Sequence, residues 1–468
     1  SSDLDLVGEL GTDEQGIFTL FVDRDNDIWM YSPLGIWVYN PEQEKWLSWL
    51  TNIIKRRSHN MVRAVSQDKQ GRIWIGTDQD GIDILDKKTG EVRQLRNKAG
   101  DERSLQNNTV MVLYEDSSET MWVGTYKKGI SYFNECAFKF GAEYIGDISC
   151  IEEDKEGYVW LGTNDVGIIY WNSVTGNRAA FPQKGTDKLT TDAIVCILKA
   201  GDGKLWIGTF GGGLICYDNG RIIHYKKNIP ERQNSLAHNN VLALAEDKQG
   251  IIWIGTLGGG VQSLNPKTGL FTTYNTTSAG LISDYVSSLC MGKEGSLWIG
   301  TAQGLSELDI ETKKVVNLEG TKSGKEYFSD QNISQVYEDS RGLIWIGTCE
   351  GLNVYNPKTD ELIILGVEQG VSSPIISGIV EDGNENIWVT TARGITNVIP
   401  AVDLKTGRYI FHSCVYDDKD GLQNSGFNLR SIKKMSSGEI LMGGLYGINR
   451  FRPDDIKYNK KRPSVMFT

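Results

Sequence analysis

The hexapeptide IIWIGT at residues 251–256 recurs with small changes along the whole chain and decides the fold. Near-copies stand at 72–77, 120–125, 158–163, 204–209, 296–301 and 343–348. The equivalent positions, including one leucine, are Trp29, Trp74, Trp122, Trp160, Trp206, Trp253, Trp298, Trp345, Trp388 and Leu441. Their period of roughly 45 residues, with four short apolar runs in each unit, predicts β-propeller blades.

The unit at 241–275 shows the parts of one blade. VLALAED alternates as a first strand, IIWIGT is a second, VQSLN a third and LFTTY a fourth, and they are separated by the turns KQG, LGGG and PKTG. No stretch has a convincing 3.6-residue apolar stripe. We therefore expect an all-β chain of four-stranded antiparallel blades with little helix.

Each letter of the repeat has a structural purpose. Asp247 is expected to accept backbone hydrogen bonds in the turn EDKQG, and Gly250 to supply a positive φ. Trp253 would wedge between neighbouring blades, Gly255 would allow close approach, and the Thr256 hydroxyl would serve the next turn. The repeated phrase is thus the scaffold, and we expect function where the copies differ.

The copies divide into a complete ring and a remainder. Copies four to ten supply seven blades, and CAFKFGAEY at 136–144 resembles a fourth strand that completes the last blade. We predict C-terminal blades of an incomplete upstream propeller at 1–135, a seven-bladed propeller at 136–457 and the start of a further domain at 458–468. A single ten-bladed ring is the alternative.

Composition excludes several classes of protein. The net charge of −11 disfavours binding to duplex nucleic acid, which needs clustered Lys and Arg. The chain has no run of about 18 apolar residues, so we expect no membrane span within it. SSDLDLVGEL at the start does not have the pattern of a signal peptide. The 7 cysteines include no CxxC pair, which argues against a zinc ribbon. Cys150, Cys196 and Cys290 are expected to be buried structural thiols.

The pattern E-D-x-x-G-x-[IL]-W-[IVL]-G-T, followed by G-[LIV] and a TG turn, resembles the two-component regulator propeller repeat. DGLQNSGFN at 420–428 and GEILMGGLYGINRFRPDDI at 438–456 resemble the closing blade of these sensors. RPSVMFT at 462–468 looks like entry into the immunoglobulin-like domain that usually follows.

The resemblance implies the periplasmic sensor region of a hybrid two-component system from saccharide-degrading gut bacteria. It implies tandem seven-bladed propellers, a homodimer, and an oligosaccharide ligand whose binding controls glycan-utilisation genes. The membrane helix, histidine kinase, receiver and DNA-binding domain would lie downstream, so phosphotransfer is not expected within this chain. No cofactor, catalytic residue or metal ligand is predicted.

The turns after W-x-G-T differ between copies and are expected to share one rim. Together with the entrance to the last blade they give the candidate ligand-binding residues Asn164, Asp165, Phe210, Leu257, Gln303, Glu350, Arg393, Asn428, Arg430 and Tyr446. Aromatic platforms with planar polar groups suit a saccharide, and Arg393 would pair with a carboxylate or sulfate. The alternative is that each is an ordinary solvated loop residue.

Two other features leave alternatives open. Trp46 and Trp49 in EKWLSWL would form either a sugar platform or a blade edge, and the basic KRR at 55–57 reads as a solvated loop. A propeller enzyme acting on glycans and a protein-interaction platform are the rival functions. The 4 histidines show no metal-ligand spacing, although Ca2+ can bind carbonyls and Asp without a motif.

Overall fold

The computed structural model describes residues 18–32, 35–55, 61–98, 104–134, 139–172, 175–181, 189, 191–227, 234–423 and 426–456. The chain divides into two compact units, Ser1–Ala137 with Lys457–Thr468, and Phe138–Ile456. The sequence analysis places the corresponding boundaries at 135/136 and 457/458. The predicted entry into a further domain at 458–468, and Arg56 and Arg57 of the basic run, lie outside the described residues.

The described part of the N-terminal unit contains three antiparallel sheets, two of four strands and one of three. Their elements are β1 (Thr19–Val22), β2 (Ile28–Ser32), β3 (Gly35–Asn40) and β4 (Lys45–Trp46), then helix α2 (Ser48–Lys55), then β5 (Val62–Gln67), β6 (Ile73–Thr77), β7 (Ile82–Leu85) and β8 (Val92–Leu95), and finally β9 (Val110–Glu115), β10 (Met121–Thr125) and β11 (Gly129–Phe133).

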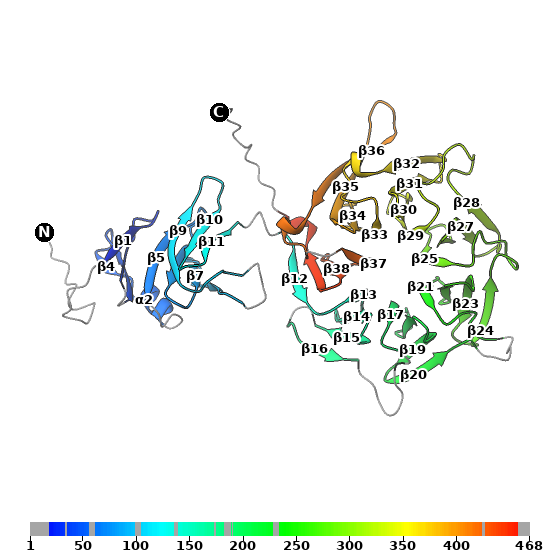
Figure 1. The fold of residues 1–468 in the computed structure, drawn as a ribbon, viewed down its shortest axis with the longest axis horizontal. Helices are drawn as coiled ribbons and strands as arrows, with labels where there is room; N and C mark the ends of the chain where they lie inside the picture. Colours follow the sequence, from blue (N-terminus) through cyan, green and yellow to red (C-terminus); the bar gives the residue numbers. More distant parts are fainter. Residues whose placement is uncertain are drawn as a thin grey trace. The chain divides into compact units, whose positions relative to one another are not determined.

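The C-terminal unit is a ring of seven four-stranded sheets, seen down its axis in Figure 1. The first three blades use β13 (Ile148–Glu153), β14 (Val159–Thr163), β15 (Ile168–Trp171), β16 (Arg178–Ala180), β17 (Ile194–Lys199), β18 (Leu205–Thr209), β19 (Leu214–Asp218), β20 (Arg221–Tyr225), β21 (Val241–Glu246), β22 (Ile252–Thr256), β23 (Val261–Asn265) and β24 (Leu270–Tyr274). The next two use β25 (Val286–Met291), β26 (Ser296–Thr301), β27 (Gly304–Asp309), β28 (Val315–Leu318), β29 (Ile333–Glu338), β30 (Ile344–Thr348), β31 (Leu352–Asn356) and β32 (Glu361–Leu365). The last two use β33 (Ile376–Glu381), β34 (Ile387–Thr391), β35 (Gly394–Val402), β36 (Tyr409–Tyr416), β37 (Phe427–Lys434), β38 (Ile440–Gly444), β39 (Gly447–Phe451) and β12 (Gly141–Tyr144), with short 3-10 turns at Val367–Gln369, Asp418–Asp420 and Pro453–Asp455.

One strand from the start of the unit closes the ring. β12 pairs antiparallel with β39, and Glu143 lies opposite Ile448. The prediction that 136–144 supplies the last blade's outer strand is confirmed for the described part of that segment. The ring therefore has seven members, and the ten-bladed alternative is wrong.

Phe140 anchors the closing segment. It is 2% exposed, and its ring lies 4.8 Å from that of Phe451 and 5.2 Å from that of Tyr416. These aromatic contacts join the residue directly before β12 to the last two blades of the unit. Its burial thus contributes directly to ring closure.

We predict that Phe140→Ala destabilises the C-terminal unit by about 3–5 kcal/mol, because it removes a buried aromatic ring and leaves a cavity. Tyr144→Ala at the end of β12 is the matched control, since Tyr144 is 57% exposed, and its effect should stay within about 0.5 kcal/mol. Urea unfolding followed by tryptophan fluorescence measures both. Equal midpoints for the two variants would contradict this account of closure.

A hydrogen bond between Asp and Trp recurs in most blades, and it is buried in each of them except the third sheet of the N-terminal unit. In the third blade of the ring, Asp247 Oδ1 accepts from the backbone N–H groups of Gln249 and Ile251, while Oδ2 accepts from Trp253 Nε1 at 2.9 Å. The carboxylate thus fastens the first turn to the tryptophan, as predicted for the turn. The same Asp–Trp bond joins residues 23 and 29, 68 and 74, 116 and 122, 154 and 160, 339 and 345, and 382 and 388.

The second blade of the ring lacks this carboxylate. Ala200 occupies the position of Asp247, and the indole nitrogen of Trp206 has no hydrogen-bond partner among the described residues. The backbone turn is otherwise preserved, because Ala200 N donates to Lys204 O and Gly203 N donates to Ala200 O. An unsatisfied buried N–H of this kind costs about 1–3 kcal/mol.

We expect Ala200→Asp to raise the free energy of unfolding by about 1–3 kcal/mol, because the new carboxylate would accept from Trp206 Nε1 and from the turn. Asp247→Ala is the reciprocal variant and should lower stability by a similar amount. Thermal unfolding of both proteins beside the wild type gives the comparison. A lower melting temperature for Ala200→Asp would refute the assigned role of the carboxylate.

The glycine of the repeated phrase lies where blades meet most closely. A Cβ on Gly255 would stand 2.7 Å from Val286 Cγ1 of the next blade, and one on Gly300 would stand 2.8 Å from Ile333 Cγ2. The expected close approach is confirmed. The sixth blade has Thr390 at this position, and there the glycine moves to the facing strand: a Cβ on Gly378 would meet Thr390 Oγ1 at 2.6 Å.

The expectation of little helix holds, but one helical stripe was missed. Helix α2 buries Leu50 and Ile54 against the first two sheets, at the i and i+4 positions of one face. Trp49 lies on the same helix and is 50% exposed, while Trp46 ends β4 and packs edge-on against Tyr39. Trp46 is therefore part of a blade edge, and the two tryptophans belong to different elements.

Lys87 joins the first two sheets of the N-terminal unit. Its Nζ lies 2.6 Å from Asp23 Oδ2, 2.8 Å from Asp25 Oδ2 and 2.7 Å from Asp27 Oδ2. Burial opposes the charged form, but the hydrogen bonds with the three carboxylates outweigh it and raise the pKa of Lys87. The three aspartates are the one group in the described part of the chain whose spacing would suit a metal ion, and an ammonium stands among them.

The third sheet of the N-terminal unit leaves one face exposed. Trp122 is 40% exposed, whereas the corresponding Trp253 and Trp345 are 1% and 0% exposed. Tyr114 and Ile130 on neighbouring strands are also exposed. An apolar sheet face of this kind is normally covered by another blade. Among the described residues, no helix is long and apolar enough to cross a membrane.

Candidate functional site

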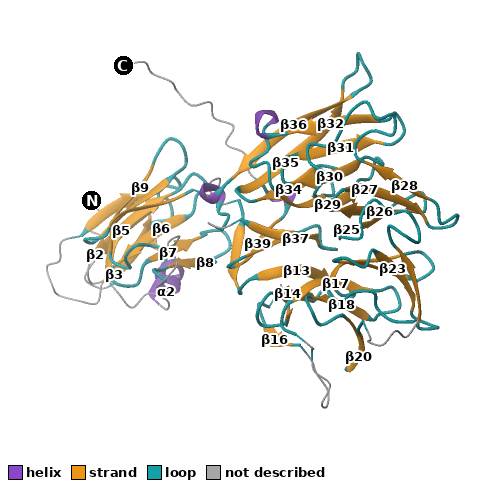
Figure 2. Ribbon diagram, turned by 45° about the vertical axis from the view of Figure 1, so that its right-hand side comes forward, coloured by secondary structure: helices purple, strands orange, loops and turns teal. Residues whose placement is uncertain are grey.

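Antiparallel order sorts the blade connections into two rims. The turns between second and third strands, and the chain entering each first strand, lie at one end of the sheets, which Figure 2 shows in an oblique view. The turns of the EDKQG and PKTG types lie at the other end. We call the first end the variable rim, because its turn sequences differ from blade to blade.

The threonine of the repeated phrase builds the turns on this rim in the first six blades of the ring, whereas the seventh blade has Gly444 at its position. Thr256 Oγ1 donates to Gly260 O, as predicted, and Thr301 Oγ1 donates to Gly304 O. In the shorter turns the threonine oxygen also accepts a hydrogen bond from the backbone N–H two residues later. Thr391 Oγ1, for example, accepts from Arg393 N. The backbone is thus satisfied internally, and the side chains at the tips are free to differ.

The structure places the turn candidates on the variable rim. Phe210 and Tyr446 are 55% and 53% exposed. Those that are exposed are Asn164, Asp165, Phe210, Gln303, Glu350, Arg393 and Tyr446, whereas Leu257, Asn428 and Arg430 are half-buried. The exposed set is spread over six different blades.

Asp147 brings two of the predicted residues together. Asn164 Nδ2 donates to Asp147 Oδ2 at 2.9 Å, and Asn428 Nδ2 donates to Asp147 Oδ1 at 2.6 Å. This network joins the first and last blades at the rim. Asp147 was missed by the sequence analysis, although its position directly before a first strand was the available signal.

Asp147 belongs to a second row of variable residues. Each lies directly before a first strand, and the row is Asp147, Ala193, Asn240, Tyr285, Asn332 and Ile375. Except at Asn332, where no such bond is seen among the described residues, their carbonyls accept from the first residue of the adjacent turn, as Ala193 O does from Phe210 N and Asn240 O from Leu257 N. The rim is therefore built from two rows of residues, and the sequence analysis found only one.

Aromatic and amide side chains lie on the rim of the second, third and fourth blades. Asn240 Oδ1 accepts from Gly211 N at 2.7 Å, directly beside Phe210. Tyr285, 55% exposed, forms an isolated bridge with Leu257. Phe210 and Tyr285 thus offer exposed aromatic faces, with the Asn240 amide between their blades.

Cys349 offers a chemical probe of the same rim. It is exposed and precedes Glu350, whereas Cys150 and Cys216 are buried and none of these thiols forms a disulfide. Partial burial, with the charges of Asp330 and Glu350, raises the pKa of Cys349. Cys196 and Cys290 are half-buried and not fully buried as expected, but burial of their thiols raises the pKa of Cys290 to about 11 and that of Cys196 to about 12.

Maleimide should therefore modify Cys349 before the other described cysteines, as mass spectrometry of tryptic peptides will show. The thiolate is the reactive form, so the rate should keep rising with pH into the alkaline range. Glu350→Gln should speed the reaction at pH 8, because it removes a negative charge that disfavours the thiolate. Glu361→Gln, remote from the rim, is the control. An unchanged rate for Glu350→Gln would show that this charge does not act on the thiol.

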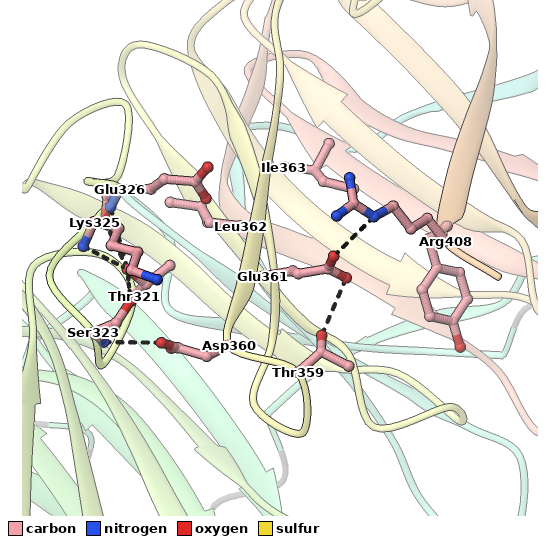
Figure 3. Close-up of a pocket in the computed structure, with 11 residues that line it drawn as sticks. Thr321, Ser323, Lys325, Glu326, Thr359, Asp360, Glu361, Leu362, Ile363 and Arg408 are labelled. Atoms are coloured by element: carbon pink, nitrogen blue, oxygen red, sulfur yellow. Dashed lines mark hydrogen bonds and ion pairs between the residues drawn. The ribbon is translucent and has the colours of Figure 1, made fainter. Parts of the chain in front are cut away.

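A separate pocket of about 450 Å³ lies at the outer edge of the ring, away from the rim (Figure 3). Glu361 accepts from Arg408 Nε at 3.3 Å, and Asp360 accepts from the backbone N–H groups of Lys322 and Ser323. Lys325 also lines the pocket. The sequence analysis missed it, because it is formed by turns of three blades that are distant in sequence.

Seven segments of the chain match the family model described as two component regulator propeller: 57–79, 104–127, 145–165, 188–211, 235–258, 280–303 and 327–350. The chain contains two-component regulator propeller repeats. Seven of the ten copies recognised in the sequence are matched, including the five that open the C-terminal ring. The family resemblance is thus confirmed.

The repeats link the chain to known signalling proteins. It is 26% identical over 278 residues to "Histidine kinase P4" of Formosa agariphila, covering 58% of this chain and 20% of that protein. The extracellular domain of a protein described as a hybrid two-component system, BT3049 of B. thetaiotaomicron, matches with a TM-score of 0.73 and 25% identity, over 93% of this chain and 56% of that one. The extracellular domain of BT4673 shares the fold, with a TM-score of 0.55 and 19% identity over 97% of this chain and 66% of that one.

The chain spans about a fifth of the curated relative and 56% of the first solved structure. Within that span, the repeats and the structural match support a sensor domain of a hybrid two-component system. Both solved domains are extracellular parts of their own proteins.

Proposed function

We propose that this chain is the periplasmic ligand-sensing region of a hybrid two-component sensor, and that it binds oligosaccharides released from polysaccharides to control glycan-utilisation genes. The observation that carries the proposal is the variable rim, where one scaffold presents different side chains from each blade. Recognition concentrated on variable loops of a rigid scaffold is the usual arrangement of a binding protein.

The chemistry of the rim favours a saccharide. Phe210 and Tyr285 supply exposed aromatic faces for sugar rings, and Asn240 and Asn164 supply amides for hydroxyl groups. Arg393 adds a guanidinium for a carboxylate or sulfate. Among the described residues, the rim shows no cluster of three metal-ligating side chains.

The remainder of the protein follows from the same proposal. Further blades of an upstream propeller would cover the exposed face around Trp122, Tyr114 and Ile130. A membrane helix and a kinase would follow this chain, and pairing of two sensor regions would carry the signal. A propeller enzyme and a protein-interaction platform are the outcomes that the following experiment separates from a sensor.

Incubation with a panel of neutral and acidic oligosaccharides should raise the melting temperature of the chain without forming product. A ligand at 100 times its dissociation constant stabilises the folded state by about 2.7 kcal/mol. Phe210→Ala should weaken binding by roughly tenfold or more, because it removes an aromatic platform worth about 1.5 kcal/mol. Bound ligand should also protect Cys349 from maleimide.

Lys248→Ala, in a turn of the opposite rim, is the matched control and should bind as the wild type does. Product formation would favour the enzyme. The interaction platform would be favoured if the oligosaccharides neither raised the melting temperature nor were converted to product. The same negative result would be required with a protein that includes further upstream blades.

A further inference from the structure

The centre of the seven-bladed ring contains one arginine in an unusual backbone conformation. Arg430 lies in β37, the first strand of the last blade, where the pairing with β38 is interrupted between Phe427 and Ile432. Its φ is 60°, a left-handed value that a side-chain-bearing residue adopts only at a cost. The corresponding bulges of the other six blades are shorter, each with one extra residue, such as Ser149 or Ser287.

The guanidinium crosses the middle of the ring. Arg430 Nη1 donates to the carbonyl oxygen of Ser287 in β25, the first strand of the fourth blade. The first strands follow one another around the centre in the order β13, β17, β21, β25, β29, β33 and β37 (Figure 1). β25 is three blades from β37 in one direction around the ring and four in the other. The hydrogen bond therefore crosses the central axis of the ring.

The charge of Arg430 has no acidic partner in the described part of the chain. The titratable groups beside it are the thiols of Cys196 and Cys150, on the second and first blades, and their raised pKa values keep them neutral, so they supply no counter-charge. Burial lowers the pKa of the guanidinium, although the residue keeps part of its surface accessible to solvent. One carbonyl satisfies one of the five N–H groups that a guanidinium carries.

The neighbouring polar groups are already engaged with one another. The hydroxyls of Ser149, Ser334 and Ser431 donate to the first carbonyl of the next blade's inner strand. Their bonds tie the blades together around the level of Arg430. An uncompensated buried charge is expensive, and proteins normally pair it with a counter-charge.

We propose that Arg430 forms an anion site on the axis of the seven-bladed ring, and that it takes a carboxylate. A guanidinium presents a planar pair of N–H donors that matches a carboxylate, and the anion would neutralise the buried charge. The carboxylate comes either from a small free acid or from an acidic sugar. Arg430 lies at the variable-rim end of β37, so an acidic sugar held at that rim is within the same part of the ring.

The backbone strain supports a ligand-binding role over a structural one. Glycine adopts a φ of 60° without penalty, so an arginine kept there costs stability in conformation as well as in desolvation. The site does not depend on saccharide recognition by Phe210 and Tyr285, because a simple acid suffices to occupy it.

Calorimetric titration of the 468-residue chain with acetate, galacturonate and galactose at constant ionic strength tests the proposal. The wild type should bind the carboxylates and not galactose. Arg430→Lys keeps the charge but loses the paired donors, and should bind about tenfold more weakly. Arg430→Gly should lose carboxylate binding, while its melting temperature without ligand should equal or exceed that of the wild type.

Arg393→Gln removes a rim guanidinium and should leave acetate binding unchanged, whereas Phe210→Ala should affect saccharides only. Binding of acetate identifies a small-anion site, and binding of galacturonate alone identifies an acidic-sugar site, and both support the proposal. Carboxylate binding that survives in Arg430→Gly, or no carboxylate binding by the wild type, would overturn it. Retained acetate binding in Phe210→Ala separates this site from the aromatic side chains of the rim.

Discussion

The pairing of β12 with β39 is the constraint on which the C-terminal unit depends. Seven blades built one after another form an open arc until a strand from the first end joins the last sheet. The closed ring places all turns of one type on one rim and all first strands around one axis. The Asp147 network and the Arg430 contact with Ser287 both exist only because distant blades are brought together in this way.

Within each blade, a small set of contacts does the same task repeatedly. The Asp–Trp hydrogen bond fixes the turn on the second strand, and the glycine lets the next blade approach. The sixth blade lacks this glycine, and it shows what the position requires. There, Thr390 stands where the other blades of the ring have glycine, and Gly378 faces it, so the facing pair still includes one residue without a side chain.

Much of the fold was predictable from the sequence, since the repeat reports local requirements that every blade shares. The turn geometry at Asp247, the space at Gly255 and the hydroxyl of Thr256 follow from residue chemistry alone. Helix α2 escaped because its apolar face covers only about two turns. The sequence identified only some of the residues on the variable rim. The turns directly follow the repeated W-x-G-T phrase and are easy to locate, whereas Asp147 and Tyr285 follow connections of irregular length. The crossing of Arg430 was not predictable, because it joins residues through the three-dimensional ring.

Lys87 has a consequence for how the N-terminal unit responds to its surroundings. A lysine ammonium sits among Asp23, Asp25 and Asp27, a spacing that elsewhere suits a divalent cation. The positive charge that neutralises the three carboxylates therefore comes from the protein itself and not from cations in the medium. The junction between the first two blades should tolerate chelators and changing calcium levels, yet acylation or carbamylation of a single amine would uncouple it.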